Sequence, residues 1–125
     1  MGRGLSELQK SILRVAYRNR SAGVKQHEAA DAVNAEILHE HFRFPLTGSV
    51  EFGGQYFDVG KIGESAYRVA RASLSQAIKR LEERGLVHLC WGITRHSGVV
   101  LTDVGHSIAK ELSVIIVKEE RSDNR

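Results

Sequence analysis

The side chains best suited to bind a partner lie within one predicted helical segment, residues 71–87. Apolar residues recur there at helical spacing, so the polar side chains between them are expected on the outer face of a helix. Glutamine can pair with adenine, arginine and lysine can pair with guanine or neutralise phosphates, and serine can reach either. The candidate DNA-binding residues of this segment are Arg71, Ser73, Ser75, Gln76, Lys79 and Arg80.

Other chemistry has less support in the sequence. There is no glycine-rich phosphate loop, no nucleophile elbow and no carboxylate pair in an acid–base setting, so we do not expect an enzyme. His88 and Cys90 lie two residues apart and could share one face of a strand, as could His39 and His41. No CxxC or HExxH motif accompanies them. We therefore expect no metal and no cofactor, with Cys90 half-buried and His39 and His41 at a helix end.

Length and charge restrict the class of protein. The chain has 125 residues, the usual size of one domain, so residues 1–125 are expected to form a single core. Its net charge of +3 permits nucleic-acid binding without requiring it. The single cysteine, Cys90, cannot form an intrachain disulfide, and no apolar run is typical of a secretory leader or a membrane span. These features predict a cytoplasmic protein.

The first part of the chain predicts two helices. Residues 5–20 combine a helical apolar repeat with Ser6 and Gln9 at the spacing of a capping box. A brief strand would fit residues 24–25, and a second helix is predicted from His27 to about His39.

Residues 41–63 interrupt the helical pattern and predict an irregular insert. The segment holds the only proline and several glycines, and Gly53-Gly54 suggests a β-hairpin, with a loop as the alternative. Aromatic residues gather here and could line a ligand pocket or form a small core; we favour the core. They are Phe42, Phe44, Phe52, Tyr56, Phe57 and Tyr67.

The second part predicts a helix, a hairpin and a last helix. Residues 64–84 are helical, as one helix or as two that meet near residue 72, and Gly85 suits the left-handed position after a helix. Residues 86–101 change to the alternation of a β-hairpin around a polar turn. Thr102 then resembles the N-cap of a last helix. The fold class is therefore mainly α with a small hairpin.

Two segments resemble the MarR-like winged helix-turn-helix regulators. Residues 71–87 end in Leu-Glu-Glu-Arg-Gly-Leu-Val, as the recognition-helix region of that family does, and Leu101-Thr102-Asp103-Val104-Gly105 resembles the opening of its C-terminal helix. The likeness is clearest over residues 71–113, whereas the 41–63 insert departs from the family pattern. It implies a winged helix in which Ser73, Ser75 and Gln76 read bases and Lys79 and Arg80 reach phosphates.

The resemblance also implies a role for the hairpin. Arg95 and His96 lie at its predicted tip, the wing, where the family often contacts the DNA backbone or the minor groove. They complete the set of candidate DNA-binding residues.

The chain is expected to form a homodimer, with the last predicted segment, residues 102–120, at the interface. Four successive β-branched residues, Val114 to Val117, cannot all face one core, and exposed apolar residues often mark an interface. They could continue the helix or form a strand. The leading hypothesis is a dimeric regulator that binds double-stranded DNA. The alternative is a winged-helix module for protein contact or for plasmid or phage replication.

Overall fold

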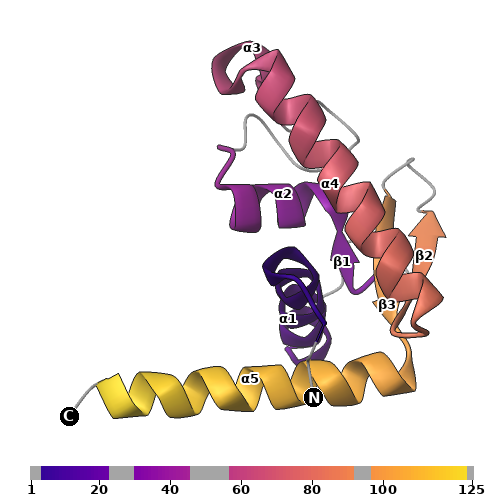
Figure 1. Cartoon of the computed structure of the whole chain (residues 1–125), viewed down its shortest axis with the longest axis vertical. Coiled ribbons are helices and arrows are strands. Elements are labelled where there is room, and N and C mark those ends of the chain that lie inside the picture. The colour runs from indigo at the N-terminus through magenta and orange to yellow at the C-terminus, as the bar shows by residue number, and fades with distance from the viewer. Residues whose placement is uncertain (1–3, 23–29, 46–56, 92–96, 124–125) are drawn as a thin grey trace.

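The chain forms a mainly helical fold with one small antiparallel sheet (Figure 1). This computed structural model describes residues 4–22, 30–45, 57–91 and 97–123, with side chains described to Ser113 in the last helix. The sheet order is β1-β3-β2. In chain order the elements are α1 (Glu7–Ser21), β1 (Ala32–Val33), α2 (Asn34–Phe42), α3 (Val59–Ile62), α4 (Glu64–Glu83), β2 (Val87–Trp91), β3 (Ser97–Leu101) and α5 (Asp103–Asp123).

Helix α1 begins at the predicted capping box. The Gln9 backbone N–H donates to the Ser6 hydroxyl at 3.1 Å, and the Ser6 backbone N–H donates to Gln9 Oε1 at 2.9 Å. Because each side chain satisfies a backbone donor that the first helical turn leaves free, the helix start is fixed. The predicted apolar face is confirmed, since Leu5, Ile12, Val15 and Ala16 are buried.

The helix predicted from His27 to about His39 is confirmed from Asn34 onward, but the prediction was wrong for residues 30–33. Ala32 and Val33 form strand β1, which pairs with β3, and α2 begins only at Asn34. The alanine-rich sequence favours a helix, but pairing with β3 overrides that preference because the Asp31 N–H donates to Val99 O at 2.8 Å. Residues 24–25 and 27–29 lie outside the described residues.

A buried carboxylate holds β1 in place. Asp31 is only 4% exposed and accepts a hydrogen bond from the Leu101 N–H at 2.8 Å. Arg20, at the end of α1, lies 2.9 Å from the same carboxylate and also donates to Leu101 O at 3.3 Å. Burial of a charge is costly unless it is paired and hydrogen-bonded, so these contacts join α1, β1 and β3 at one point.

The segment that could have been one helix or two is one continuous helix, α4. Its end has the predicted glycine, with Gly85 at φ +76°. The Leu86 N–H donates to Leu81 O at 3.0 Å and the Gly85 N–H to Glu82 O at 2.9 Å. These two backbone hydrogen bonds form a Schellman motif, which turns the chain out of the helix and into β2.

The predicted hairpin is confirmed as β2 and β3, which pair from Val87–Leu101 to Trp91–Ser97. Ser97 and Gly98, which were placed in the turn, belong to β3 instead. Val87, Val99 and Leu101 alternate toward the core and are buried. The predicted turn residues Thr94, Arg95 and His96 lie outside the described residues.

Helix α5 begins directly after Thr102, the predicted N-cap, and its start is hydrogen-bonded to the end of α4. The Thr102 hydroxyl accepts from the Gly105 N–H at 3.0 Å and donates to Gly85 O at 2.6 Å. The Thr102 N–H donates to Leu86 O at 3.1 Å. Gly105 packs so closely on Leu86 that an added Cβ would lie 1.8 Å from Leu86 O.

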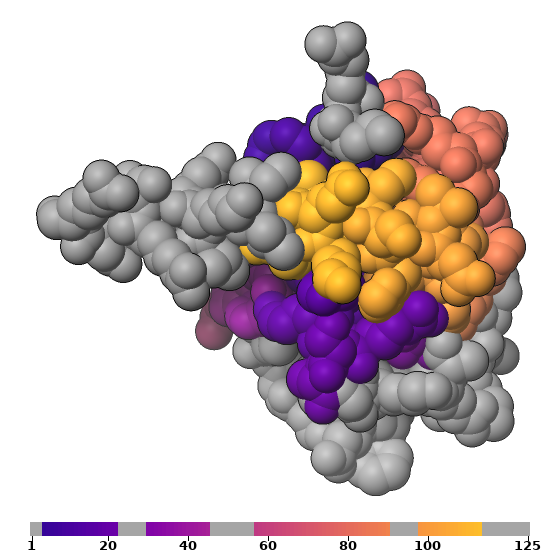
Figure 2. Space-filling model, turned by 90° about the horizontal axis from the view of Figure 1, so that it is seen from below, coloured from indigo at the N-terminus to yellow at the C-terminus, as the bar shows by residue number. Residues whose placement is uncertain are grey.

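Residues 114–117, for which the sequence allowed either a helix or a strand, are helical, since α5 continues to Asp123. Ala109 and Leu112 are buried, and the first part of α5 lies across the lower face of the molecule against α1 (Figure 2). Farther along, α5 extends past α1 (Figure 1). No helix among the described residues is both long and apolar enough to cross a bilayer.

The prediction of an irregular insert over residues 41–63 was wrong at both of its ends, which are helical. Helix α2 reaches Phe42, Arg43 adopts a left-handed conformation at φ 64°, and α3 follows an Asp58 N-cap. Residues 46–56, with the predicted Gly53-Gly54 hairpin, lie outside the described residues.

Replacement of Gly105 by alanine should destabilise the protein by at least about 2 kcal/mol, because the new methyl group overlaps the Leu86 backbone, which cannot move without shifting α4. Urea unfolding monitored by circular dichroism measures this change. Ser107→Ala, at an exposed position of the same helix, should change stability by less than about 0.5 kcal/mol. Equal stabilities for the two variants would contradict the close contact.

Candidate nucleic-acid interface

Helix α4 divides sharply into a buried and an exposed face. Its buried side chains pin it to the core, and the predicted DNA-binding residues are all exposed. The buried set is Ala70, Leu74, Ala77, Ile78 and Leu81. The exposed candidates are Arg71, Ser73, Ser75, Gln76, Lys79 and Arg80.

The exposed candidates form two rows rather than one. Arg71, Ser75 and Lys79 follow one another at intervals of four residues, which places them along one side of the helix. Ser73, Gln76 and Arg80 form the other row at intervals of three and four. Ala72 neighbours both Ser75 and Gln76 and is exposed, so the side chains are short where the rows meet, and a partner surface can approach closely.

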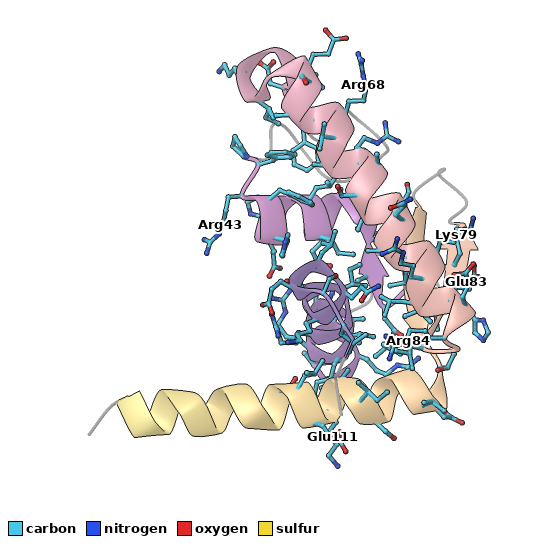
Figure 3. The ribbon with its side chains drawn as sticks, viewed as in Figure 1. Arg43, Arg68, Lys79, Glu83, Arg84 and Glu111 are labelled. Atoms are coloured by element: carbon cyan, nitrogen blue, oxygen red, sulfur yellow. The ribbon has the colours of Figure 1, made fainter. Side chains whose placement is uncertain are left out.

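The charge of this face is mostly positive. The salt bridges among the described residues involve Lys10, Arg18, Arg20 and Arg68. Within the same residues, Lys79 and Arg80 form no salt bridge. Figure 3 shows Arg68 and Lys79 toward opposite ends of α4, with Glu83 close to Lys79.

Glu82 has a structural task on this helix. Its Oε2 accepts from the Leu89 N–H of β2 at 3.2 Å, which joins the end of α4 to the hairpin. Lys79 and Arg80 are the cations of the central exposed surface, and Glu82 and Glu83 follow them at the end of the helix.

Sequence reasoning missed Arg68 and the role of Tyr67. The Arg71 guanidinium carbon lies 5.8 Å from the centre of the Tyr67 ring, and this cation–π contact steadies the arginine. Tyr67 packs in turn on Phe57 and Phe44, with ring centroids 5.9 and 6.1 Å away. The signal available in the sequence was the i, i+4 spacing of Tyr67 and Arg71.

The aromatic residues at the ends of the insert pack on one another, as expected for a small core. Phe42 stacks on Phe44 at 5.7 Å, and Phe44 meets Phe57 at 6.1 Å. Phe57 is only 5% exposed and belongs to the main core. Phe52 and Tyr56 lie outside the described residues.

The wing candidates cannot be placed with α4, since Arg95 and His96 lie outside the described residues. The described strands β2 and β3 that precede and follow them pack beside α4 and β1. The structure thus brings together the candidates on α4 only.

The basic residues of α1 belong to a different surface. Arg18 donates to Glu40 Oε2 at 2.6 Å and to Glu36 Oε2 at 2.9 Å. The hydrogen bond from Arg18 holds the pKa of Glu40 below its usual range, whereas burial raises the pKa of Glu36. This triad fixes α1 to α2, so Arg18 is not a free cation for a nucleic acid.

The histidines predicted at a helix end lie in the last turn of α2, as expected. His39 Nδ1 is 2.7 Å from Phe44 O, and His41 Nδ1 is 2.7 Å from the Ser11 hydroxyl. Among the described residues, no three potential ligands come together in a way that could hold a metal ion.

His88 and Cys90 share a strand, β2, as the sequence suggested. His88 is exposed, and Cys90 is half-buried. Burial, and next the negative charge of Asp31, raise the pKa of the Cys90 thiol. Burial therefore disfavours the thiolate form of Cys90, which is the reactive and metal-binding form.

Comparison of the chain with protein-family models, with curated proteins and with solved structures finds no match. The likeness to MarR-like regulators over residues 71–113 therefore remains a prediction from the residues themselves.

Alkylation of Cys90 by iodoacetamide should show the effect of burial on its pKa. The thiolate is the reactive form, so the pH at which the rate reaches half its maximum should lie higher in the native protein than in the chain unfolded in urea. Mass spectrometry measures the rate at each pH. A native midpoint at or below that of the unfolded chain would refute the assignment.

Proposed function

We propose that the protein is a cytoplasmic winged helix-turn-helix regulator that binds double-stranded DNA as a homodimer. One observation carries the proposal: a polar, basic face of α4 points away from the core while α4 runs directly into a hairpin. The element order α1-β1-α2-α3-α4-β2-β3-α5, with the sheet order β1-β3-β2, is compatible with a winged helix. No metal or cofactor is needed for this function.

The exposed face of α4 suits insertion into the major groove. A groove about 12 Å wide admits one α-helix, and its base edges offer donors and acceptors to side chains. Ser73, Ser75 and Gln76 are the readers in this proposal, since Gln76 can bond adenine in a bidentate manner. Lys79 and Arg80 bind phosphates on the groove walls, and Arg95 and His96 add backbone contacts from the wing.

Dimerisation in this proposal uses α5. Its first part is covered by α1 through Ala109 and Leu112, whereas the helix extends past α1 over the segment that holds Val114 to Val117 (Figure 1). Two copies related by a two-fold axis would present two α4 helices to successive turns of the duplex. A palindromic target follows from this symmetry.

Selection from a pool of random DNA duplexes at two salt concentrations tests the proposal. A regulator retains duplexes with a palindromic motif, more weakly at the higher salt, because bound cations displace counterions from phosphates. Salt-sensitive retention without a motif would point to replication-type or architectural binding. No retention at low salt would reject DNA binding in favour of the protein-contact module.

Two substitutions on α4 should have different effects on binding. Gln76→Ala removes a base-reading group and should relax sequence preference at one position in each half-site, by about 1–3 kcal/mol of discrimination. Lys79→Ala removes a phosphate contact and should weaken binding to all duplexes alike. Fluorescence anisotropy with matched and single-mismatch duplexes separates the two. If neither variant alters DNA affinity, α4 is not the recognition helix.

A further inference from the structure

The N-terminal half of α4 carries a second basic surface beside a hollow. The hollow has a volume of about 500 Å³, and Arg68, Arg71 and Ser75 lie along it together with Glu64 and Tyr67. We infer that Arg68 and Arg71 form a phosphate clamp, which binds the phosphodiester backbone of duplex DNA outside the major groove contacted by the rest of α4. This inference rests on the proposed function and deepens it.

The length of α4 places this clamp beyond the groove. A helix of 20 residues is about 30 Å long, and Ser73 to Arg80 occupy only about 10 Å of that length. If Ser73 to Arg80 lie in the groove, the straight N-terminal half of α4 continues for about 13 Å beyond them while the groove curves away around the duplex, so the helix passes the edge of the groove at its N-terminal end. The sugar–phosphate backbone runs along that edge, and Arg68 and Arg71 are the cations that reach it.

Arg71 is prepared for this contact. Its guanidinium is held over Tyr67, which is itself fixed by Phe44 and Phe57. A side chain already restrained in the free protein loses less entropy when it binds. Its guanidinium can donate two parallel hydrogen bonds to one phosphate group.

Arg68 is available to bind a phosphate because its ion pair with Glu64 is weak. Its guanidinium lies 3.0 Å from the Glu64 carboxylate, but the two side chains are 76% and 77% exposed. An exposed ion pair of this kind adds little stability, so a phosphate can replace Glu64. Glu64 then acts against DNA binding, both by repulsion and by competition for Arg68.

The clamp predicts opposite effects for neighbouring substitutions. Arg68→Gln and Arg71→Gln should each weaken binding to a random-sequence duplex, and each should lower the slope of log K against log salt by about 0.9, the value for one lost phosphate contact. Glu64→Gln should strengthen binding to the same duplex. Fluorescence anisotropy at several salt concentrations measures both quantities.

Matched controls separate the clamp from the overall charge of the protein. Lys110→Gln and Glu111→Gln change the net charge by the same amounts at exposed positions of α5, and Figure 3 shows Glu111 at the opposite end of the molecule from Arg68. These variants should leave the slope unchanged. Thermal melting of every variant confirms that it is folded.

The outcomes distinguish the clamp from the proposed function. If the wild-type protein binds the duplex but the arginine variants behave like Lys110→Gln, the clamp is refuted and the DNA-binding proposal stands. If the wild-type protein does not bind duplex DNA at low salt, or binds duplex RNA instead, both are refuted. A lower slope for the arginine variants alone supports the clamp.

Discussion

Two consecutive residues, Leu101 and Thr102, hold the parts of this fold together. The Leu101 N–H donates to the buried Asp31 carboxylate, which Arg20 also binds, so β3 is joined to β1 and α1. One residue later, Thr102 hydrogen-bonds to Gly85 O and Leu86 O, so the start of α5 is joined to the end of α4. Because these bonds are adjacent in the chain, the hairpin and α4 have one fixed relation to α1 and α5.

This constraint explains why two separate sequence segments look like parts of one pattern. The Gly85-Leu86-Val87 end of α4 and the Leu101-Thr102-Asp103-Val104-Gly105 start of α5 contact each other directly. Thr102 supplies the hydrogen bonds, and Gly105 supplies the space for Leu86 O. A chain that needs this contact must keep both segments, whatever its outer face binds. The resemblance is therefore informative about packing first and about function only through the face of α4.

The same packing gives the outer face its chemical character. Leu74, Ile78 and Leu81 leave no rotational freedom to α4, so its polar rows are presented in a fixed orientation. Surface charge alone would be a weak argument, since exposed cations are common on helices. Glu82 of α4 is occupied with Leu89, while Lys79 and Arg80 have no salt-bridge partner among the described residues.

Local signals predicted much of the fold. The Ser6–Gln9 box, Gly85, Thr102 and the period change after residue 85 each act through contacts within a few residues, and each was read correctly. Strand β1 was missed because its existence depends on β3, which lies more than 60 residues away. The continuity of α4 could not be decided either, since Ser73 and Ser75 cap helices in some settings and simply face solvent here.

The candidate site was predictable to a similar extent. Residue type and helical spacing identified the exposed residues from Arg71 to Arg80, because the apolar stripe of α4 determines which side faces outward. Arg68 was missed because its interest comes from the hollow and from Tyr67, whose packing partners Phe44 and Phe57 belong to other elements. Contacts between distant segments, such as those of Tyr67 with Phe44 and Phe57, have no signature in the order of residues, whereas the contact of Tyr67 with Arg71 has one in its i, i+4 spacing.

The most direct test of the central claim is a map of the DNA-contacting surface on the protein. Amide resonances of labelled protein can be followed by NMR as a random-sequence duplex is added at low salt. If α4 enters the groove, the largest shifts fall on α4, between Arg71 and Arg80, while residues of α1 near Arg18 and of α5 near Lys110 change little. Shifts confined to α1 or α5, or none at all, would contradict the assignment of α4 as the helix that enters the groove.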